Sequence, residues 1–291
     1  MSIIKISALN PIQFHQYGVG DFAYNLVPSI EFQKGYNQVY FAGDRPGIQL
    51  LSDMNVDLQI QVVDINDTLI DTWHFDLLQT TYGAYNVYQC NDILPSTPGI
   101  YFIKIVVSHN DELVTFYNEP INLVASADNV LSIEYTHDQN EFDVLFLEAN
   151  VFNFFLRIEG GIRSEGLAPG GKFTMFQDLD YKSVMLQSQP FNVEKFIFGP
   201  GDGVPNWMAD KLNRIFGLST VMINGVQYSR NEGAKMERIG DTGYPLAGWS
   251  LDLIKTENPY GNEVDTAETF LASNGVITAS TGLYTASNNL L

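Results

Sequence analysis

Short strand-like runs separated by polar turns recur along most of this chain, and they constrain its fold more than any other feature. Residues 56–63 alternate in VDLQIQVV, and a turn at 66–67 leads into TLIDTW. After a turn segment at 95–99, IYFIKIVV passes through a polar loop at 109–111 into ELVTFYN, which Pro120 ends. Because no long helical pattern intervenes, we predict an immunoglobulin-like β-sandwich without its disulfide.

The second half continues the β-rich pattern with different sequences. A small, polar stretch near residues 126–129 predicts a domain boundary, and the strands expected beyond it include VLSIEYT, EFDVLFL at 141–147 and NFFLRIEG. The Asn-Gly pair at 224–225 joins TVMI to VQYSR and is the strongest two-residue hairpin signal in the chain. We therefore predict an all-β chain with one sandwich over 1–126 and a second over 127–258.

One short amphipathic helix is expected in the second domain, from about Pro205 to Phe216. Pro205 suits the first turn and Gly217 suits the position after the helix end. The apolar residues that share one face at helical spacing are Trp207, Met208, Leu212, Ile215 and Phe216. We expect this face to pack on the second sandwich, with a partner groove as the alternative.

Residues 259–291 are small, polar and free of basic side chains, and we predict that they form an extended C-terminal arm. The arm either lies on a neighbouring subunit by strand addition or is a frayed terminus. Its isolated apolar anchors are Leu271, Val276, Ile277, Leu283 and Tyr284.

The charge balance disfavours two classes of partner. Thirty-four acidic residues against fifteen basic ones give a formal charge of −19, which repels nucleic-acid phosphates and anionic lipid. The sequence has no run of eighteen apolar residues and no signal-peptide pattern at its start, so we expect a soluble, unexported protein that binds neither membrane nor specific nucleic-acid sequences. A charged share of only 17% is typical of a surface covered by neighbours, or of a long-stranded protein rich in Thr and Tyr.

No catalytic residue, cofactor site or metal site is predicted, and we expect the protein not to be an enzyme. The four histidines are far apart in sequence and none accompanies a G-x-S-x-G turn. The glycine-rich segment 199–203 lacks the Lys-Ser/Thr of a phosphate loop and is interpreted as a tight connection into the helix. Cys90 is interpreted as a small buried hydrophobe. The histidines are His15, His74, His109 and His137.

Two ligand-binding hypotheses have some support. Oxygen donors cluster around the turn near residue 66, but their spacing departs from the EF-hand pattern and Asx residues are common in turns. Trp73, Trp207 and Trp249 would form a sugar-stacking face only if exposed, whereas the alternation of Trp249 with Leu251 and Leu253 predicts a core position. The oxygen donors are Asp64, Asn66, Asp67 and Asp71.

The segment from GVPNWMADKLNRIFGLSTVMINGVQYSR through GWSLDLI, together with FFLRIEGGIRSEG upstream, resembles virion proteins of crAss-like phages that infect Bacteroidetes. The resemblance covers residues 130–255 and carries no functional residues. It implies a non-enzymatic structural protein of the virion, assembled in the host cytoplasm as a ring or adaptor subunit of the tail or neck. Its partners would be further copies of itself and neighbouring tail or neck proteins. If such a ring lines the channel through which DNA passes, the acidic charge of the chain would keep the DNA from adhering to the channel wall.

Two other functions compete with this one. A receptor- or carbohydrate-binding module of a phage appendage predicts exposed aromatics or a calcium site. A glycoside hydrolase of the sandwich type predicts two carboxylates facing each other in a groove.

Overall fold

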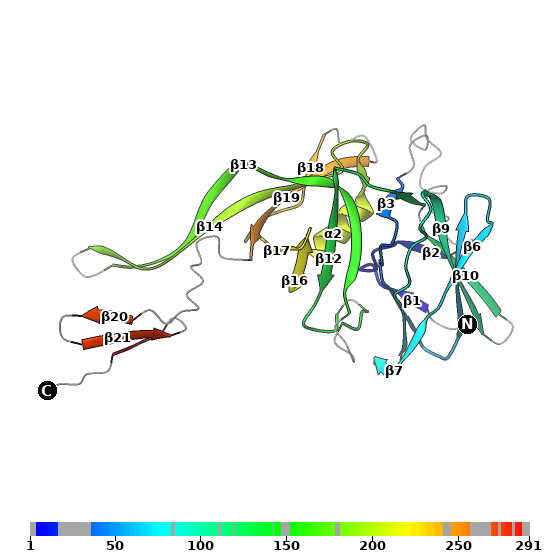
Figure 1. Ribbon diagram of the computed structural model, residues 1–291, viewed down its shortest axis with the longest axis horizontal. Coiled ribbons are helices and arrows are strands. Elements are labelled where there is room, and N and C mark those ends of the chain that lie inside the picture. The colour runs from blue at the N-terminus through cyan, green and yellow to red at the C-terminus, as the bar shows by residue number, and fades with distance from the viewer. Residues whose placement is uncertain are drawn as a thin grey trace. The chain divides into compact units, whose positions relative to one another are not determined.

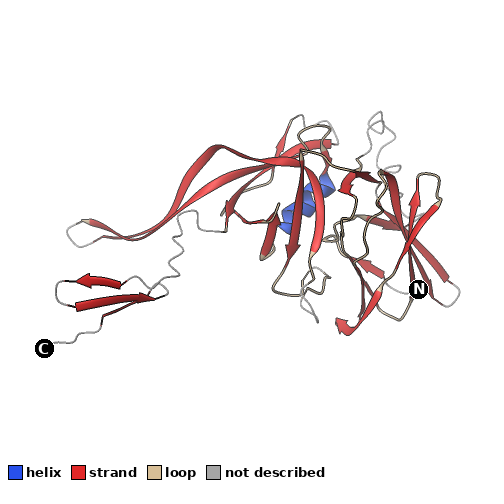
Figure 2. Ribbon diagram, viewed as in Figure 1, coloured by secondary structure: helices blue, strands red, loops and turns tan. Residues whose placement is uncertain are grey.

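The fold consists almost entirely of strands. A computed structural model describes residues 4–16, 36–82, 85–109, 112–118, 120–141, 143–146, 152–177, 181–240, 246–256, 269–272, 275–280 and 283–286. Strands dominate these residues, and α2 is the one helix among them, which confirms the predicted all-β class (Figures 1 and 2). No helix in the described ranges is long and apolar enough to cross a membrane. The chain divides into two compact units, one of residues 1–168 with 193–255 and one of residues 169–192 with 256–291.

The first sandwich consists of two sheets, formed by strands between residues 4 and 124. One sheet has the order β1 (Ile4–Ile6), β4 (Ile48–Ser52), β8 (Tyr85–Cys90), β7 (Asp76–Tyr82). The other contains β2 (Phe14–Gln16), β3 (Gln38–Phe41), β5 (Asp57–Asp64), β6 (Leu69–Trp73), β9 (Gly99–His109), β10 (Glu112–Asn118) and β11 (Ile121–Val124). The order β1-β4-β8-β7 matches the A-B-E-D sheet of immunoglobulin domains. In the other sheet β5 matches strand C, β9 matches strand F, and β10 continued by β11 matches strand G.

A tyrosine corner supports the same assignment. The hydroxyl of Tyr101, near the start of β9, donates a hydrogen bond to the carbonyl of Thr97 at 2.9 Å. Two residues later Ile103 occupies the position of the second immunoglobulin cysteine, and it is fully buried in the same core cluster as Leu50. The first sandwich is therefore immunoglobulin-like and has apolar packing where those domains have a disulfide.

The hairpins predicted for the first domain are confirmed. β5 pairs antiparallel with β6 after the turn near residue 66, and β9 pairs antiparallel with β10. β10 ends at Asn118 and β11 begins at Ile121, so the ladder is interrupted around Pro120. Residues 110–111 of the predicted loop lie outside the described residues.

The second domain is an eight-stranded sheet that closes on itself. The order β14-β13-β12-β16-β17-β19 is completed by antiparallel pairing of β19 with β14, so opposite walls of the sheet face each other across the core. The short strands β15 and β18 also pair with β19. The strands are β12 (Val130–Thr136), β13 (Phe154–Gln177), β14 (Ser183–Phe198), β15 (Val204–Pro205), β16 (Thr220–Ile223), β17 (Val226–Arg230), β18 (Glu237–Ile239) and β19 (Leu246–Lys255).

The strand predicted at 141–147 is wrong. Its described residues are irregular, although Val144, Leu145 and Phe146 are buried. Side chains replace a neighbouring strand here, because the N–H of Leu145 donates to Gln49 Oε1 at 2.6 Å and the N–H of Phe146 donates to Asn140 Oδ1 at 2.9 Å. The apolar pattern therefore reports burial of this segment and not a strand.

Helix α2 (Asn206–Ile215) confirms the predicted helix to within one residue at each end. The segment 199–203 leads into it as predicted, with φ of +61° at Gly199 and +86° at Gly203. A Cβ at Gly203 would lie 2.6 Å from the backbone nitrogen of Ala247, so only glycine fits this connection. The buried face contains Met208, Leu212 and Ile215, as expected, and also Lys211, which was not.

Lys211 joins the helix to the start of the chain. Its ammonium group is buried and donates hydrogen bonds to the carbonyls of Asn10 and Pro11. Within the described ranges no carboxylate forms an ion pair with Lys211, and burial lowers the pKa of its amine to about 7. A neutral amine still has two hydrogens, one for each carbonyl.

Further polar contacts connect the two sandwiches within the same compact unit. Gln49 of β4 binds the backbone of Leu145 through both ends of its amide, and Arg157 of β13 forms a bidentate ion pair with Asp44. The hydroxyl of Tyr135 on β12 donates to the carbonyl of Leu9. These contacts make a buried polar junction between strands far apart in sequence.

The predicted C-terminal arm contains strands that pair with one another. β20 (Thr269–Ala272), β21 (Gly275–Ser280) and β22 (Leu283–Ala286) form a three-stranded antiparallel meander that holds the five predicted anchor positions. Residues 259–268 and 287–291 of the arm lie outside the described residues.

Candidate interaction site

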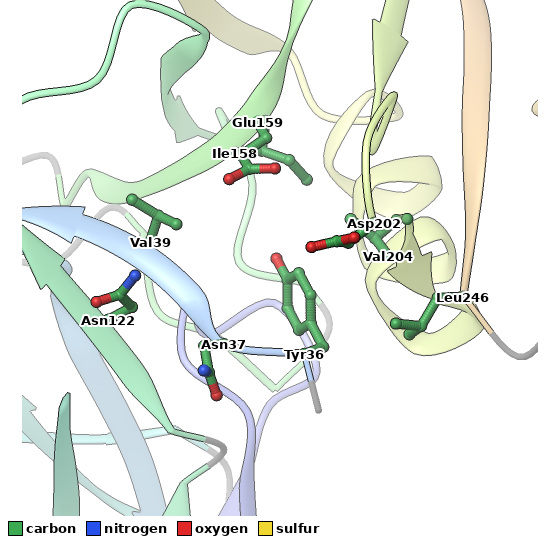
Figure 3. Close-up of a pocket in the computed structure, with 10 residues that line it drawn as sticks. Tyr36, Asn37, Val39, Asn122, Ile158, Glu159, Asp202, Val204 and Leu246 are labelled. Carbon is green, nitrogen blue, oxygen red and sulfur yellow. The ribbon is translucent and has the colours of Figure 1, made fainter. Parts of the chain in front are cut away.

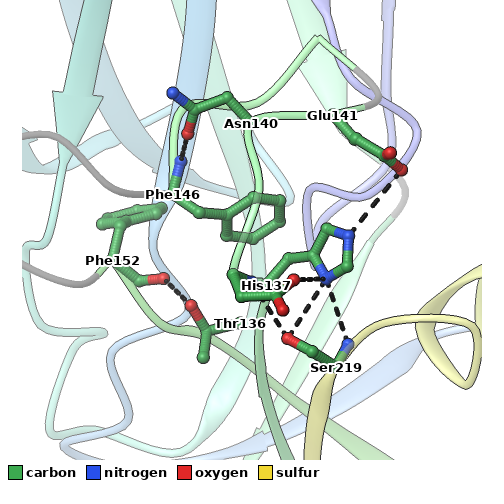
Figure 4. Close-up of polar contacts among 8 residues, drawn as sticks. Thr136, His137, Asn140, Glu141, Phe146, Phe152 and Ser219 are labelled. Carbon is green, nitrogen blue, oxygen red and sulfur yellow. Dashed lines mark hydrogen bonds and ion pairs between the residues drawn. The ribbon is translucent and has the colours of Figure 1, made fainter.

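Folding brings His137 to Ser219, an arrangement that the sequence did not indicate (Figure 4). His137 Nδ1 lies 3.1 Å from Ser219 Oγ, and Nε2 lies 3.7 Å from Glu141 Oε2. However, the backbone N–H of Ser219 donates to the same Nδ1 at 3.1 Å, and the N–H of Asp138 donates to Oγ at 2.9 Å. Since the Nδ1 lone pair already accepts a backbone proton, the cluster links two turns and does not present an activated serine.

The other histidines lie apart in the first sandwich: His15 on β2, His74 after β6, and His109 at the end of β9. The ring of His109 contacts the carbonyl of Asn55, with Nδ1 and the oxygen 3.0 Å apart. No ligand set of three His, Cys, Asp or Glu side chains occurs within the described ranges.

The oxygen donors near residue 66 stabilise a turn. Asp64 Oδ1 accepts the N–H of Asn66 at 2.8 Å and that of Thr68 at 2.9 Å. These hydrogen bonds, that of Thr68 first, lower the pKa of Asp64. Asp71 accepts the N–H of Thr72, and Asp67 lies 3.8 Å from Lys104 Nζ. The carboxylates therefore have local partners instead of converging on one point.

The tryptophans do not form an open platform for a sugar ring. Trp73 is buried in the first core, while Trp207 and Trp249 are partly buried against the second, where Leu251 and Leu253 are also buried. Cys90 is buried as predicted, and burial raises the pKa of its thiol to about 12. It is therefore a packing residue with little thiolate at neutral pH.

A pocket of about 180 Å³ lies between β3 and the loop after β14 (Figure 3). Glu159 and Asp202 contribute carboxylates, Asn37 and Asn122 contribute amides, and Tyr36 contributes an aromatic ring. The ring of Tyr36 packs edge-on against Trp207, with centroids 5.8 Å apart. The lining is polar and carries negative charge, so it suits a small ligand with several hydrogen-bond donors.

The hairpin of β13 and β14 is the most unusual element of the chain. β13 has 24 residues and β14 has 16, but β12 pairs only with Phe154–Glu159 of β13 and β19 only with Val193–Phe198 of β14. Beyond those partners β13 and β14 continue as a two-stranded ribbon (Figure 1). We call residues 161–192 the distal hairpin. An isolated two-stranded ribbon is only marginally stable in water.

Large apolar side chains are exposed near the end of the distal hairpin. Their exposed fractions range from 53% to 83%, and the residues are Met175, Phe176, Tyr181, Met185 and Leu186. Isolated exposed apolar residues are ordinary on soluble proteins, but here five lie within twelve positions of one hairpin.

The distal hairpin also differs from the rest of the chain in charge. It contains three basic and three acidic residues and is formally neutral, so the charge of −19 resides entirely elsewhere. The charged residues are Arg163, Glu165, Lys172, Asp178, Asp180 and Lys182. A neutral, apolar ribbon on a strongly acidic protein can approach another acidic surface with little repulsion.

No protein-family model matches the chain, and no curated protein matches it. Among solved structures the chain is similar to "Crystal structure of Dpr2 Ig1-Ig2 in complex with DIP-Theta Ig1-Ig3", at 10% identity, with 87% of this chain and 95% of that chain covered and a TM-score of 0.16. A TM-score this low leaves the immunoglobulin-like assignment to the strand order and the tyrosine corner described above.

Sequence reasoning missed the distal hairpin. The stretch GGIRSEGLAPGG contains five glycines and a proline, which predict a loop and hide the continuation of β13. The signal that could have found it is the run FTMFQ followed at once by a polar turn and SVML, which is a hairpin pattern in its own right.

Proposed function

We propose that this protein is a non-enzymatic structural subunit that acts through protein–protein interfaces. The single observation that carries the proposal is the distal hairpin, with its five exposed apolar side chains and no strand outside the hairpin paired with it in the described part of the chain. Soluble proteins usually shield such ribbons, so a partner is expected to cover this one in the working assembly.

The two sandwiches belong to one compact unit, which also contains the base of the hairpin. The buried polar junction ties the sandwiches together through Lys211, Gln49 and Arg157, so the base of the hairpin is mounted on one compact unit.

The resemblance of residues 130–255 to crAss-like phage proteins suggests which assembly this is. We propose a ring or adaptor subunit of the tail or neck of a virion, assembled in the host cytoplasm, with copies of itself and neighbouring tail or neck proteins as partners. The formal charge of −19 accords with a position near packaged or passing DNA that must not adhere.

Quantitative mass spectrometry of purified virions of the phage that encodes this chain tests the proposal. We expect the protein in every preparation, at a fixed copy number relative to the portal protein. Its presence in lysates of infected cells but not in virions purified through two successive density gradients would overturn the proposal.

The pocket supports a second candidate, a receptor- or carbohydrate-binding module of a phage appendage. Its two carboxylates, two amides and tyrosine match the donors and acceptors that hold sugars or amines. A glycan array probed with the wild-type chain and with Asn122→Leu tests it. Binding that the substitution abolishes would favour this candidate, and an array without signal would reject it for the glycans displayed.

A further inference from the structure

We propose that the distal hairpins of neighbouring copies of this chain pair edge to edge, β14 of one copy with β13 of the next, to form a continuous intermolecular β-sheet. This inference rests on the proposed structural role and names the partner as a second copy of the chain. It also names the contact, which is a backbone ladder and not a side-chain groove.

Within the part of the chain that the structure describes, neither outer edge of the distal hairpin has a partner strand. In the described residues β13 pairs only with β12 and β14, and β14 pairs only with β13 and β19. The contacts to β12 and β19 stop at Glu159 and Val193, so residues 161–177 and 183–192 have a strand on one side alone. Each edge offers a row of backbone N–H and C=O groups to a further strand.

Two prolines limit where a ladder can form. Pro169 in β13 and Pro190 in β14 have no N–H to donate, so each interrupts an edge. Beyond them, residues 170–177 and 183–189 contain no proline. The paired segments of neighbouring copies are therefore expected to lie between the prolines and the tip.

The exposed apolar side chains lie on both faces of the same segment. Met175 and Phe176 are consecutive on β13, and Met185 and Leu186 are consecutive on β14, so each pair projects one residue to either face. A groove in a partner would cover one face. A neighbouring hairpin in the same sheet brings its own apolar residues beside those on both faces as cross-strand neighbours.

Charge favours a second copy at this site. Two chains of charge −19 repel each other over most of their surfaces, but the distal hairpin is formally neutral. Self-pairing is thus least opposed at this element.

The contact is head-to-tail, because it joins the β14 edge of one copy to the β13 edge of the next. Repeating the same step adds antiparallel strands in the order β13, β14, β13, β14, and a rotation that closes yields a ring with no free edge. The ring expected for a tail or neck subunit is therefore compatible with this geometry.

Cross-linking between single-cysteine chains tests the pairing. Cys90 is the one natural cysteine and is replaced in a Cys90→Ala background. One chain then carries Thr174→Cys on β13 and the other Ser183→Cys on β14, both at exposed positions. Each chain has one thiol, so a covalent heterodimer after mixing and treatment with a short bismaleimide reports a contact between copies and never one within a hairpin.

We expect a several-fold higher heterodimer yield from the mixture than homodimer from either chain alone. Light scattering in parallel should show a high mass that falls to the monomer in Phe176→Ser with Met185→Ser but persists in Leu113→Ser. Leu113 is the matched control, since it is 67% exposed and lies on β10.

Two outcomes would overturn the inference. A stable oligomer without preferential heterodimer would place the contact elsewhere, and a monomer at all concentrations would exclude self-pairing. Neither result contradicts the proposed function, because the mass spectrometry of virions tests that function separately. A chain that is present in virions but monomeric in isolation would still be a structural subunit, and its hairpin would have another partner.

Discussion

The guanidinium of Arg157 forms two hydrogen bonds with the carboxylate of Asp44, at 2.5 and 2.8 Å, across the boundary between the two sandwiches. Both side chains are largely buried, with exposed fractions of 16% and 8%, and the guanidinium lies 3.8 Å from the ring centroid of Phe41. The pair is therefore shielded from the solvent that weakens ion pairs at the surface.

Replacing Arg157 by Met should lower the free energy of unfolding by about 3 kcal/mol, because Asp44 keeps a buried charge without its partner. Urea denaturation measures the change. Lys195→Met is the control, since Lys195 is half exposed and pairs with Asp252 at 3.3 Å; it should cost less than about 1 kcal/mol. Equal losses in the two variants would show that the junction is not shielded.

Lys211 should make stability depend on pH. Its pKa in the folded protein is lowered to about 7, whereas its ordinary value is 10.5, so between these values the unfolded chain binds a proton that the folded chain does not. The free energy of unfolding should then rise from pH 7 to pH 10, by about 1 kcal/mol per pH unit, and show no dependence on this group below pH 7.

The variant Lys211→Met isolates that contribution. It removes the titrating amine and keeps most of the volume, so the difference in unfolding free energy between wild type and variant should change over the same pH window. Denaturant titrations at pH 6, 7, 8 and 9 measure it. Parallel pH curves for the two proteins would contradict the assignment.

The tyrosine corner should stabilise the first sandwich measurably. Tyr101→Phe removes one hydroxyl and leaves the Thr97 carbonyl without that donor, and we expect a loss of about 1 kcal/mol. Thermal unfolding monitors it. Tyr181→Phe, at a residue 83% exposed, is the control and should leave the midpoint unchanged.

Gly203 should tolerate no side chain. Its φ is +86° and an added Cβ would meet backbone atoms of Leu246 and Ala247, so Gly203→Ala should unfold the second domain or cost more than about 3 kcal/mol. Gly43→Ala provides the comparison, because Gly43 has φ of +88° with open space around it and should lose only about 1–2 kcal/mol. Circular dichroism and urea titration of both variants measure the two losses of stability. The loss in Gly43→Ala reports the cost of positive φ alone, and the additional loss in Gly203→Ala reports the steric clash with the backbone.

Local patterns predicted much of the fold. The hairpin at Asn224-Gly225 has positive φ at both residues, 49° and 78°, as the two-residue turn requires, and α2 follows the apolar face that predicted it. These features depend on residues close in sequence, where turn chemistry and periodicity act.

The parts that escaped prediction depend on distant partners. Gln49 acts as a strand substitute for Leu145, 96 positions away, and nothing near either residue signals the contact. From the sequence alone, Lys211 is expected on the polar, solvent-facing side of the helix. In the structure it is buried because its amine donates hydrogen bonds to the carbonyls of Asn10 and Pro11. The distal hairpin was missed for a related reason. Pairing between β13 and β14 outweighs the loop propensity of the glycines in β13, and this pairing cannot be seen from the local sequence.

The Lys211 contact also bears on the order in which the chain can fold. Asn10 lies 201 positions before Lys211, so the segment around residues 9–11 emerges from the ribosome long before α2 exists to receive it. The immunoglobulin-like sandwich can form its strand pairs early. The segment around residues 9–11 lacks its hydrogen bonds to Lys211 until the second domain has been synthesised. Stabilisation by this junction is thus a late event, and nascent chains released before residue 211 should be more easily cut by proteases near their start.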